Sequence, residues 1–284
     1  MHMTGGRDIA LTGVPRSGTT LACHLLGRAT DTLALFEPMP VEQLSLDRAN
    51  ALGEIESFFQ SARQRAITQG RVPSKHRDGR VPDNPIGAHA DPCHGRPWLA
   101  EHGELNVDKP LNEQFTLVVK HNAAFTALLP QLADRFEVYA IVRNPLAVLA
   151  SWHSVNLPVS HGRLPAGERL DPDLGQALHS EDDLLARQIH ILDWFFSRYA
   201  ATLETDRVIR YEDMVASRGQ CLFATTRVPG LPDASPLASR NASNQYQTSR
   251  APMLAQALCR HGGAYLRYYA RDDILDLAAC MQET

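Results

Sequence analysis

One segment near the N-terminus, residues 8–37, restricts the possible folds more than any other part of the chain. It reads DIALTGVPRSGTTLACHLLGRATDTLALFE: an apolar stretch, a glycine-rich turn at residues 13–20, and then leucines at helical spacing. A strand, a glycine-rich turn and a helix in this order can bind phosphate, because the N–H groups of the turn point inward and the helix N-terminus adds partial positive charge. The sequence therefore predicts a phosphate-binding loop at the start of an α/β fold.

The loop differs from the usual nucleotide-binding P-loop, GxxxxGK[ST]. Gly13 and Gly18 keep the glycine spacing, but Thr19 occupies the lysine position and the cation of the loop is Arg16. The P-loop lysine and the hydroxyl after it serve β- and γ-phosphates together with Mg²⁺. An arginine inside the loop instead suits a single phosphate-like group held by two hydrogen bonds.

These residues resemble the 5′-phosphosulfate loop, PxSGTT, of the sulfotransferases that use 3′-phosphoadenosine 5′-phosphosulfate (PAPS). The version with arginine in the loop is similar to protein-tyrosine sulfotransferases and related bacterial enzymes, in which a glutamate at a fixed spacing beyond the arginine is the catalytic base. The residue at that spacing here, 21 positions after Arg16, is Glu37. The resemblance implies that the loop residues bind the phosphosulfate end of PAPS: Pro15, Arg16, Ser17, Gly18, Thr19 and Thr20.

A second part of the resemblance lies at residues 136–151. FEVYAIV reads as a buried strand and is followed by Arg143-Asn144-Pro145 and a helix that carries Ser151. Ligands bind at the carboxyl ends of strands in open α/β sheets, and Ser151, two helical turns on, falls on the same side as Arg143. The resemblance implies that Arg143 and Ser151 hold the 3′-phosphate of PAPS and of its product, 3′-phosphoadenosine 5′-phosphate (PAP).

The C-terminal third is less similar to the family. A loop in this part of the family's chains folds over the nucleotide with serine and a basic residue, and the candidates here are Ser239, Arg240 and Arg250. We expect Ser239 and Arg250 to contact the donor.

Residues 115–121 (FTLVVKH) read as a buried parallel strand that ends in a cation. The resemblance places Lys120 beside the sulfuryl group. Many cytosolic relatives use a histidine two positions after this lysine as the base, but that position is Asn122 here, and His121 comes one position earlier. We therefore expect Glu37 to be the base, with His121 as the second candidate or as a group that orients the acceptor.

Length, charge and cysteine content narrow the class of protein. A chain of 284 residues is long enough for one large α/β domain, and its net charge of −4 argues against a general nucleic-acid binder. Five cysteines without a CxxC pair suit a reducing compartment. No signal peptide or stretch of about 18 apolar residues is evident. We expect a cytoplasmic, bacterial relative of the membrane-anchored eukaryotic enzymes, with residues 1–284 forming one sulfotransferase domain.

Two segments rich in proline and glycine, residues 70–112 and 155–180, read as loop-rich insertions that act as lids or bind the acceptor. Between residues 63 and 80 there are six arginines and lysines against one acid, Asp78. This basic run is either a solvated surface or a docking site for an anionic acceptor such as an acidic glycan or peptide. The histidines of the first segment are His76, His89, His94 and His102. Asp91, Cys93 and His94 match no common zinc spacing, so no metal is expected.

The remaining apolar patterns predict one or two helices at residues 41–69 and single helices at 122–134 and 181–203. A strand is expected at 207–211, and two helices at 251–280, broken at Gly262-Gly263. Glu212, in the Tyr-Glu-Asp sequence after the last strand, is expected to brace neighbouring loops.

Together these patterns predict a P-loop NTPase-like, three-layer α/β/α fold with a central parallel sheet. The predicted activity is transfer of a sulfuryl group from PAPS to a hydroxyl of a glycan, a peptide tyrosine or a small natural product, with a carboxylate base. One alternative is a P-loop small-molecule kinase that uses ATP–Mg²⁺, against which Thr19 argues. Another is a nucleotide-binding scaffold without chemistry, against which the joint presence of five residues argues: Arg16, Glu37, Lys120, Arg143 and Ser151.

Overall fold

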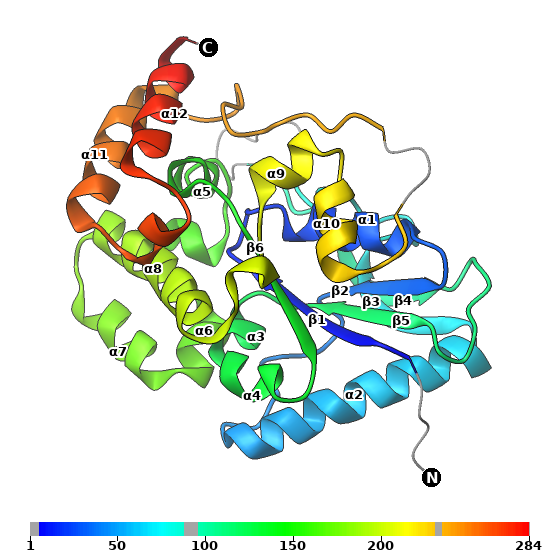
Figure 1. The fold of residues 1–284 in the computed structure, drawn as a ribbon. Coiled ribbons are helices and arrows are strands. Elements are labelled where there is room, and N and C mark those ends of the chain that lie inside the picture. The colour runs from blue at the N-terminus through cyan, green and yellow to red at the C-terminus, as the bar shows by residue number, and fades with distance from the viewer. Residues whose placement is uncertain (1–5, 88–95, 231–234, 284) are drawn as a thin grey trace.

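A five-stranded parallel sheet forms the centre of the computed structural model, which describes residues 6–87, 96–230 and 235–283 (Figure 1). The strand order is β2-β5-β1-β6-β7, and every pairing is parallel. The strands are β1 (Asp8–Gly13), β2 (Thr32–Phe36), β5 (Thr116–Lys120), β6 (Glu137–Val142) and β7 (Val208–Arg210). Because the strands are parallel, their carboxyl ends meet at one edge of the sheet.

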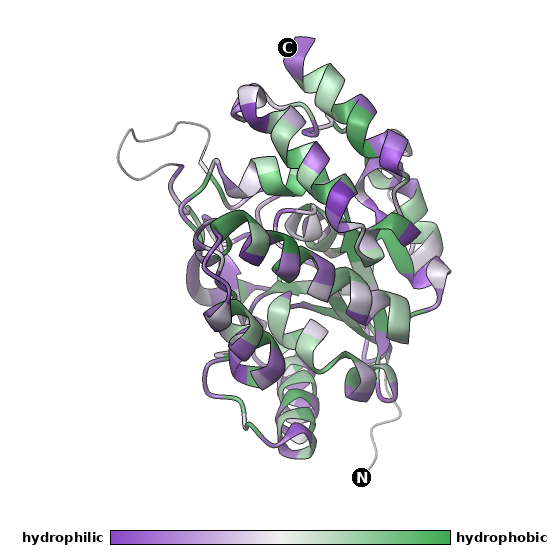
Figure 2. Ribbon diagram, turned by 90° about the vertical axis from the view of Figure 1, so that its left-hand side faces the viewer, coloured by the Kyte–Doolittle hydropathy of each residue, from purple (hydrophilic) through white to green (hydrophobic). Residues whose placement is uncertain are grey.

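Helices cover both faces of the sheet, with α1 and α10 above it and α2, α3 and α4 below it in Figure 1. Every residue of β2 and β5 is buried, as are nearly all of β1 and β6. Strands covered on both faces read as continuous apolar runs, which is why the sequence located them. In Figure 2 the hydrophobic residues gather along the sheet and the helix faces turned toward it. The three-layer α/β/α fold with a central parallel sheet is confirmed.

Most predicted helices are also confirmed. The longer ones are α1 (Thr19–Arg28), α2 (Arg48–Thr68), α5 (Pro145–Trp152), α8 (Leu184–Thr202), α11 (Ala251–His261) and α12 (Arg271–Glu283). The shorter ones are α9 (Tyr211–Ala216) and α10 (Gln220–Thr226), with 3₁₀ turns η2 (Thr205–Arg207), η3 (Thr248–Arg250) and η4 (Ala264–Arg267). The single helix expected at residues 122–134 is instead two, α3 (Ala123–Ala127) and α4 (Leu129–Ala133). Pro130 lies in the first turn of α4, where it cannot continue a preceding helix.

The prediction of irregular structure is wrong for much of residues 155–180. This segment forms η1 (Pro158–His161), α6 (Pro165–Leu170) and α7 (Pro172–Ser180). A proline begins each of these three elements, at positions where a missing N–H costs nothing and a fixed φ favours the helix. Proline content therefore marked helix starts here, not disordered chain.

The other predicted insertion, residues 70–112, contains an antiparallel hairpin of β3 (Arg71–His76) and β4 (Glu101–Asn106). The hairpin is joined to the main sheet where Phe36 N donates to Ser74 Oγ at 3.0 Å. His89 and His94, with Asp91 and Cys93, lie outside the described residues. Within the described ranges, no helix is both long and apolar enough to cross a membrane.

Arg63, on α2, is buried and ties this helix to the start of the sheet. Its guanidinium donates to Phe115 O at 2.7 Å and to Arg7 O at 3.0 Å, and it pairs with the Asp8 carboxylate. Arg65, two residues further along α2, forms an ion pair with Glu104, and both side chains of this pair are partly exposed. The same stretch of sequence thus holds one structural and one surface cation.

We predict that Arg63→Met lowers the free energy of unfolding by roughly 3 kcal/mol, because it leaves buried carbonyl groups and a carboxylate without their partner. Arg65→Met should cost at most about 1 kcal/mol, as exposed ion pairs do. Urea unfolding followed by circular dichroism measures both. Equal losses in the two variants would contradict the structural role of Arg63.

Candidate active site

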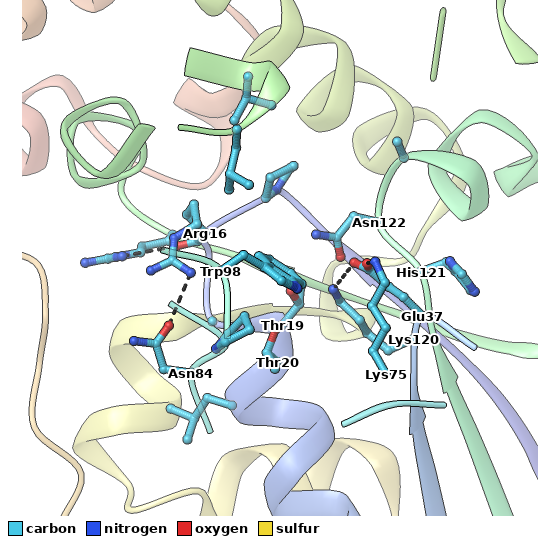
Figure 3. Close-up of a pocket in the computed structure, with 18 of the residues that line it drawn as sticks. Arg16, Thr19, Thr20, Glu37, Lys75, Asn84, Trp98, Lys120, His121 and Asn122 are labelled. Carbon is cyan, nitrogen blue, oxygen red and sulfur yellow. Dashed lines mark hydrogen bonds and ion pairs between the residues drawn. The ribbon is translucent and has the colours of Figure 1, made fainter. Parts of the chain in front are cut away.

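A cavity of about 630 Å³ opens at the carboxyl edge of the sheet. Four neighbouring strands each deliver one charged residue to it, at or just beyond the end of the strand: Arg16 after β1, Glu37 after β2, Lys120 in β5 and Arg143 after β6. In the close-up of Figure 3, Arg16 and Asn84 lie on one side, Glu37 lies with Lys75 and Lys120 on the other, and Trp98 lies between them. The structure therefore brings the predicted loop arginine, carboxylate and lysine into one site.

The loop after β1 leaves the backbone N–H groups at the start of α1 free for a ligand. Gly18 is the N-cap of α1 without a side-chain cap, and the first N–H bonded to it is that of Ala22. Gly18, Thr19, Thr20 and Leu21 all line the cavity. This is the arrangement of an anion site at a helix N-terminus.

Two hydrogen bonds and the conformation of Gly18 fix the shape of the loop. Trp152 Nε1 donates to Pro15 O at 2.8 Å, and Ser17 Oγ donates to Ile141 O at 2.7 Å. Gly18 has φ of +94°, and a Cβ there would lie 2.6 Å from the Tyr211 ring. Because its hydroxyl bonds Ile141, Ser17 is buried and holds the loop together, whereas Pro15, Thr19 and Thr20 face the cavity.

Arg16 is a half-buried cation, and the acceptors that it meets among the described residues are neutral. Its Nε donates to Ser151 Oγ at 3.2 Å and its Nη1 to Asn84 Oδ1 at 3.3 Å. Burial lowers the pKa of Arg16 to about 10, and the nearby Arg143 acts in the same direction. At neutral pH the group keeps its charge, and a buried charge is costly without a counter-ion. Among the described residues the Arg16 side chain is bonded to neutral groups, so an anionic ligand would balance its charge.

Arg143 lies directly against the loop. Its Nη1 donates to Arg16 O at 3.1 Å, its Nε to Asn241 Oδ1 at 2.7 Å and its Nη2 to Tyr246 OH at 3.2 Å. The guanidinium also stacks on Tyr211, 4.7 Å from the ring centroid. These partners are neutral too. Arg16 and Arg143 are adjacent, and both line the same end of the cavity.

Glu37 lies between two lysines. Its Oε1 is 2.6 Å from Lys120 Nζ, and its Oε2 is 2.7 Å from Lys75 Nζ. Burial alone would raise the pKa of Glu37, but the two ammonium groups outweigh it and hold the pKa well below its usual range. The carboxylate is therefore ionised at any working pH.

Lys75 is a site residue that the sequence analysis missed. It belongs to the basic run of residues 63–80, which the sequence left open as a docking surface. The structure disperses that run, because Arg63 is buried, Arg65 pairs with Glu104, and Lys75 points into the cavity. No local signal marks Lys75, since its place depends on how the hairpin joins β2.

His121 is held in a position that does not suit a base. Its Nε2 accepts a hydrogen bond from Met39 N at 3.2 Å, so that nitrogen's lone pair is occupied. Burial lowers the pKa of His121 to about 3, although Glu37 acts against this shift. Figure 3 shows its ring to the side of the Glu37 cluster. The contact instead secures the turn that follows Glu37.

The two predicted C-terminal contacts are not at the cavity. Ser239 and Arg250 are exposed, and Ser239 Oγ accepts from Asn241 N at 3.3 Å. The same loop contributes other lining residues instead: Arg240, Ser243, Gln245 and Tyr246. Arg96 and Trp98, which follow the undescribed residues 88–95, also line the cavity and carried no motif in the sequence.

Glu212 braces the loops as expected. Its Oε1 accepts from Asn144 N at 3.0 Å and from Asn241 Nδ2 at 2.8 Å, and its Oε2 accepts from Tyr269 OH at 2.7 Å. One carboxylate thus joins the Arg143 turn, the loop over it and the C-terminal region. Among the residues that the structure describes, no group of three or more histidines, cysteines and acids is placed to hold a metal ion.

Neither a known family nor a curated protein sequence matches this chain. Among solved structures, the sulfotransferase STF1 from Mycobacterium tuberculosis H37Rv is similar over 97% of this chain and 77% of that chain, at 12% sequence identity and a TM-score of 0.35. A likeness this distant does not assign a function.

We predict that Gly18→Ala lowers the free energy of unfolding by about 1–3 kcal/mol, because alanine is strained at this φ and its methyl group meets Tyr211. Gly53→Ala is the matched control, since it lies in α2 with nothing within 4 Å of the added Cβ. That substitution should stabilise the protein by up to about 1 kcal/mol through helix propensity. Thermal unfolding of the two variants checks both, and a stabilising Gly18→Ala would be inconsistent with the loop geometry.

Proposed function

We propose that the protein is a PAPS-dependent sulfotransferase that transfers a sulfuryl group to an acceptor hydroxyl. The observation that carries the proposal is the pair of guanidinium groups of half-buried Arg16 and buried Arg143, which have neutral partners among the described residues and adjoin an uncapped helix N-terminus. A carboxylate between two lysines lies in the same cavity. The first feature suits an anionic ligand, and the second provides an ionised carboxylate with lone pairs left over to accept a proton.

The chain's residues fit PAPS. Arg16 and the N–H groups at the start of α1 would hold the 5′-phosphosulfate, with the Thr19 and Thr20 hydroxyls as further donors. Arg143 would hold the 3′-phosphate. Ser151 would act indirectly, because its Oγ accepts a hydrogen bond from Arg16 Nε and so positions that guanidinium. Arginine suits both positions because its planar group binds phosphate oxygens in pairs.

PAPS supplies the sulfuryl group, and the protein's residues would supply position and charge. Glu37 would take the proton of the acceptor hydroxyl as its oxygen bonds to sulfur and the bond from sulfur to the 5′-phosphate breaks. Arg16 and Lys120 would neutralise the charge that gathers on the departing phosphate. General-base assistance of this kind is worth about a hundred- to ten-thousand-fold in rate.

The kinase alternative is less well supported. A P-loop kinase needs a lysine after the second loop glycine and a free acid at a strand end for Mg²⁺. Thr19 stands at the lysine position, and both oxygens of Glu37 are paired with lysines.

Calorimetric titration with PAP, and in parallel with ATP plus Mg²⁺, tests the proposal. We expect micromolar PAP binding without metal, and a large loss of PAP affinity in Arg143→Met. The matched control is Arg135→Met, since Arg135 is exposed and pairs with Glu56 away from the cavity. Binding of ATP–Mg²⁺ without a response to PAP would support the kinase instead, and no binding of either would support a scaffold.

We predict that Glu37→Gln lowers the transfer rate by about 10²–10⁴-fold, because the proton acceptor is lost. PAP binding should not weaken, because the change leaves Lys75 and Lys120 without their carboxylate and so adds positive charge to the cavity. Glu56→Gln, an exposed residue on α2, serves as the control and should keep full activity. Transfer of ³⁵S-labelled sulfuryl groups measures the rate, and calorimetry measures the affinity. Full activity of Glu37→Gln would exclude Glu37 as the base.

The pH dependence of kcat/KM should show whether Lys75 lowers the pKa of Glu37. Lys75 helps to hold the pKa of Glu37 below its ordinary value of 4.5, so its removal raises that pKa. Because kcat/KM requires ionised Glu37, it should persist in the wild type as the pH falls through 4.5, and its acidic limb should lie at higher pH in Lys75→Met.

Arg77→Met, an exposed change on the same hairpin, should leave the profile in place. Circular dichroism at each pH separates loss of activity from unfolding. An acidic limb at the same pH in Lys75→Met and the wild type would show that Lys75 does not act on the base.

A further inference from the structure

One side of the cavity is almost entirely apolar. Its lining comes from four segments: Met39 and Val41 after β2, Ala123 and Ala124 in α3, Leu157 to Val159 around η1, and Leu164 to Ala166 at the start of α6. We call this set the apolar wall. Its members are aliphatic side chains from parts of the chain far apart in sequence, which is how a pocket for an apolar ligand is built.

The apolar wall lies next to Glu37 and Lys120. Met39 and Val41 follow Glu37 directly, and Met39 N donates to His121, the neighbour of Lys120. Helix α6 packs against α3, which begins three residues after Lys120, and Arg169 of α6 donates to Leu44 O. These contacts join three of the segments around the end of the cavity where proton removal would occur, and residues 157–159 line the same cavity.

Charge in this part of the cavity does not favour an anion. The exposed Glu42 lines the cavity beside the apolar wall and is negative, while Lys75 and Lys120 are both paired with Glu37. The other lining cations belong to the opposite end: Arg96 donates to Ser154, and Arg240 lies in the loop over Arg143. Glu37 balances only one of the two lysine charges and Glu42 offsets the other, so an anionic acceptor would find no excess of positive charge beside the apolar wall.

Trp98 adds a flat surface to the same cavity. Its ring is 38% exposed and lies 5.9 Å from the Phe36 ring and 5.3 Å from Lys75 Nζ. An aromatic or alicyclic body could pack on it at little entropic cost, because the ring is already held by its neighbours.

We propose that the acceptor is an uncharged, largely apolar alcohol or phenol, bound with its body on the apolar wall and its hydroxyl beside Glu37. This inference rests on the proposed sulfuryl transfer and narrows its acceptor. It sets aside acidic glycans and acidic peptides, because the cations of the basic run that stay exposed, Arg71, Arg77 and Arg80, do not line the cavity. Removing apolar ligand surface from water then provides the affinity.

Calorimetry on the PAP-saturated protein tests this inference with two probes of similar size, 2-naphthol and 2-naphthoate. We expect 2-naphthol to bind at least about tenfold more tightly, because burying an unpaired carboxylate is costly. Equal or tighter binding of 2-naphthoate would overturn the inference. Naphthol binding that needs no PAP is compatible with it, whereas a protein that binds PAP but not naphthol contradicts it and leaves the proposed transferase intact.

Two variants locate the binding surface. Val41→Asp and Pro165→Asp each place a charge on the apolar wall at a position that is not fully buried, and each should weaken 2-naphthol binding by about tenfold or more. Leu46→Asp is the matched control, since Leu46 is 66% exposed and lies outside the cavity lining.

PAP affinity must stay unchanged in all three variants, which shows that they fold. Unchanged naphthol binding in both wall variants would overturn the inference. Absence of PAP binding in the wild-type protein would contradict the proposed function, and this inference would then fall with it.

Discussion

The parallel hydrogen bonding of β2, β5, β1 and β6 decides where Glu37, Lys120, Arg16 and Arg143 can lie. In the β2–β5 pairing, Phe36 is opposite Lys120, so the next residue, Glu37, reaches Lys120 and also donates its N–H to Lys120 O at 2.9 Å. On the other side, Gly13 passes so close to β6 that a Cβ would lie 2.4 Å from Ile141 O. That approach turns the loop over β6. The sheet thus positions both the Glu37 cluster and the loop that carries Arg16.

The charged groups at the two ends of the cavity have different kinds of partner. At one end the Glu37 carboxylate lies within hydrogen-bond distance of two lysines, so each ammonium group has an anionic partner, although the cluster keeps one net positive charge. At the other end Arg16 and Arg143 have amide, hydroxyl and carbonyl partners, which orient the guanidinium groups but do not balance their charge. An anion at that end would gain from charges already desolvated and positioned, so its binding would need little reorganisation.

The sequence predicted the parts of the structure that depend on local patterns. Buried parallel strands appear as continuous apolar runs, and the loop is marked by its glycines, so Arg16, Glu37, Lys120 and Arg143 were placed in one cavity. Residues brought in by tertiary contacts were not predicted. Lys75 reaches the site only because the hairpin bonds to β2 at Phe36, and the helices at residues 155–180 were hidden because proline was read as a sign of loops.

The basic run of residues 63–80 shows why local charge is weak evidence for a partner. A count of charges along the chain treats its cations as one surface, but the fold uses Arg63 to join α2 to the sheet and Lys75 to hold the carboxylate. What would determine the acceptor of the proposed transfer is instead the set of groups that line the cavity near Glu37, which combines the apolar wall with Glu42, His102 and Asn122. Specificity in such a site would come from excluding charge as much as from fitting shape, since an unpaired carboxylate loses hydration that the apolar wall cannot replace.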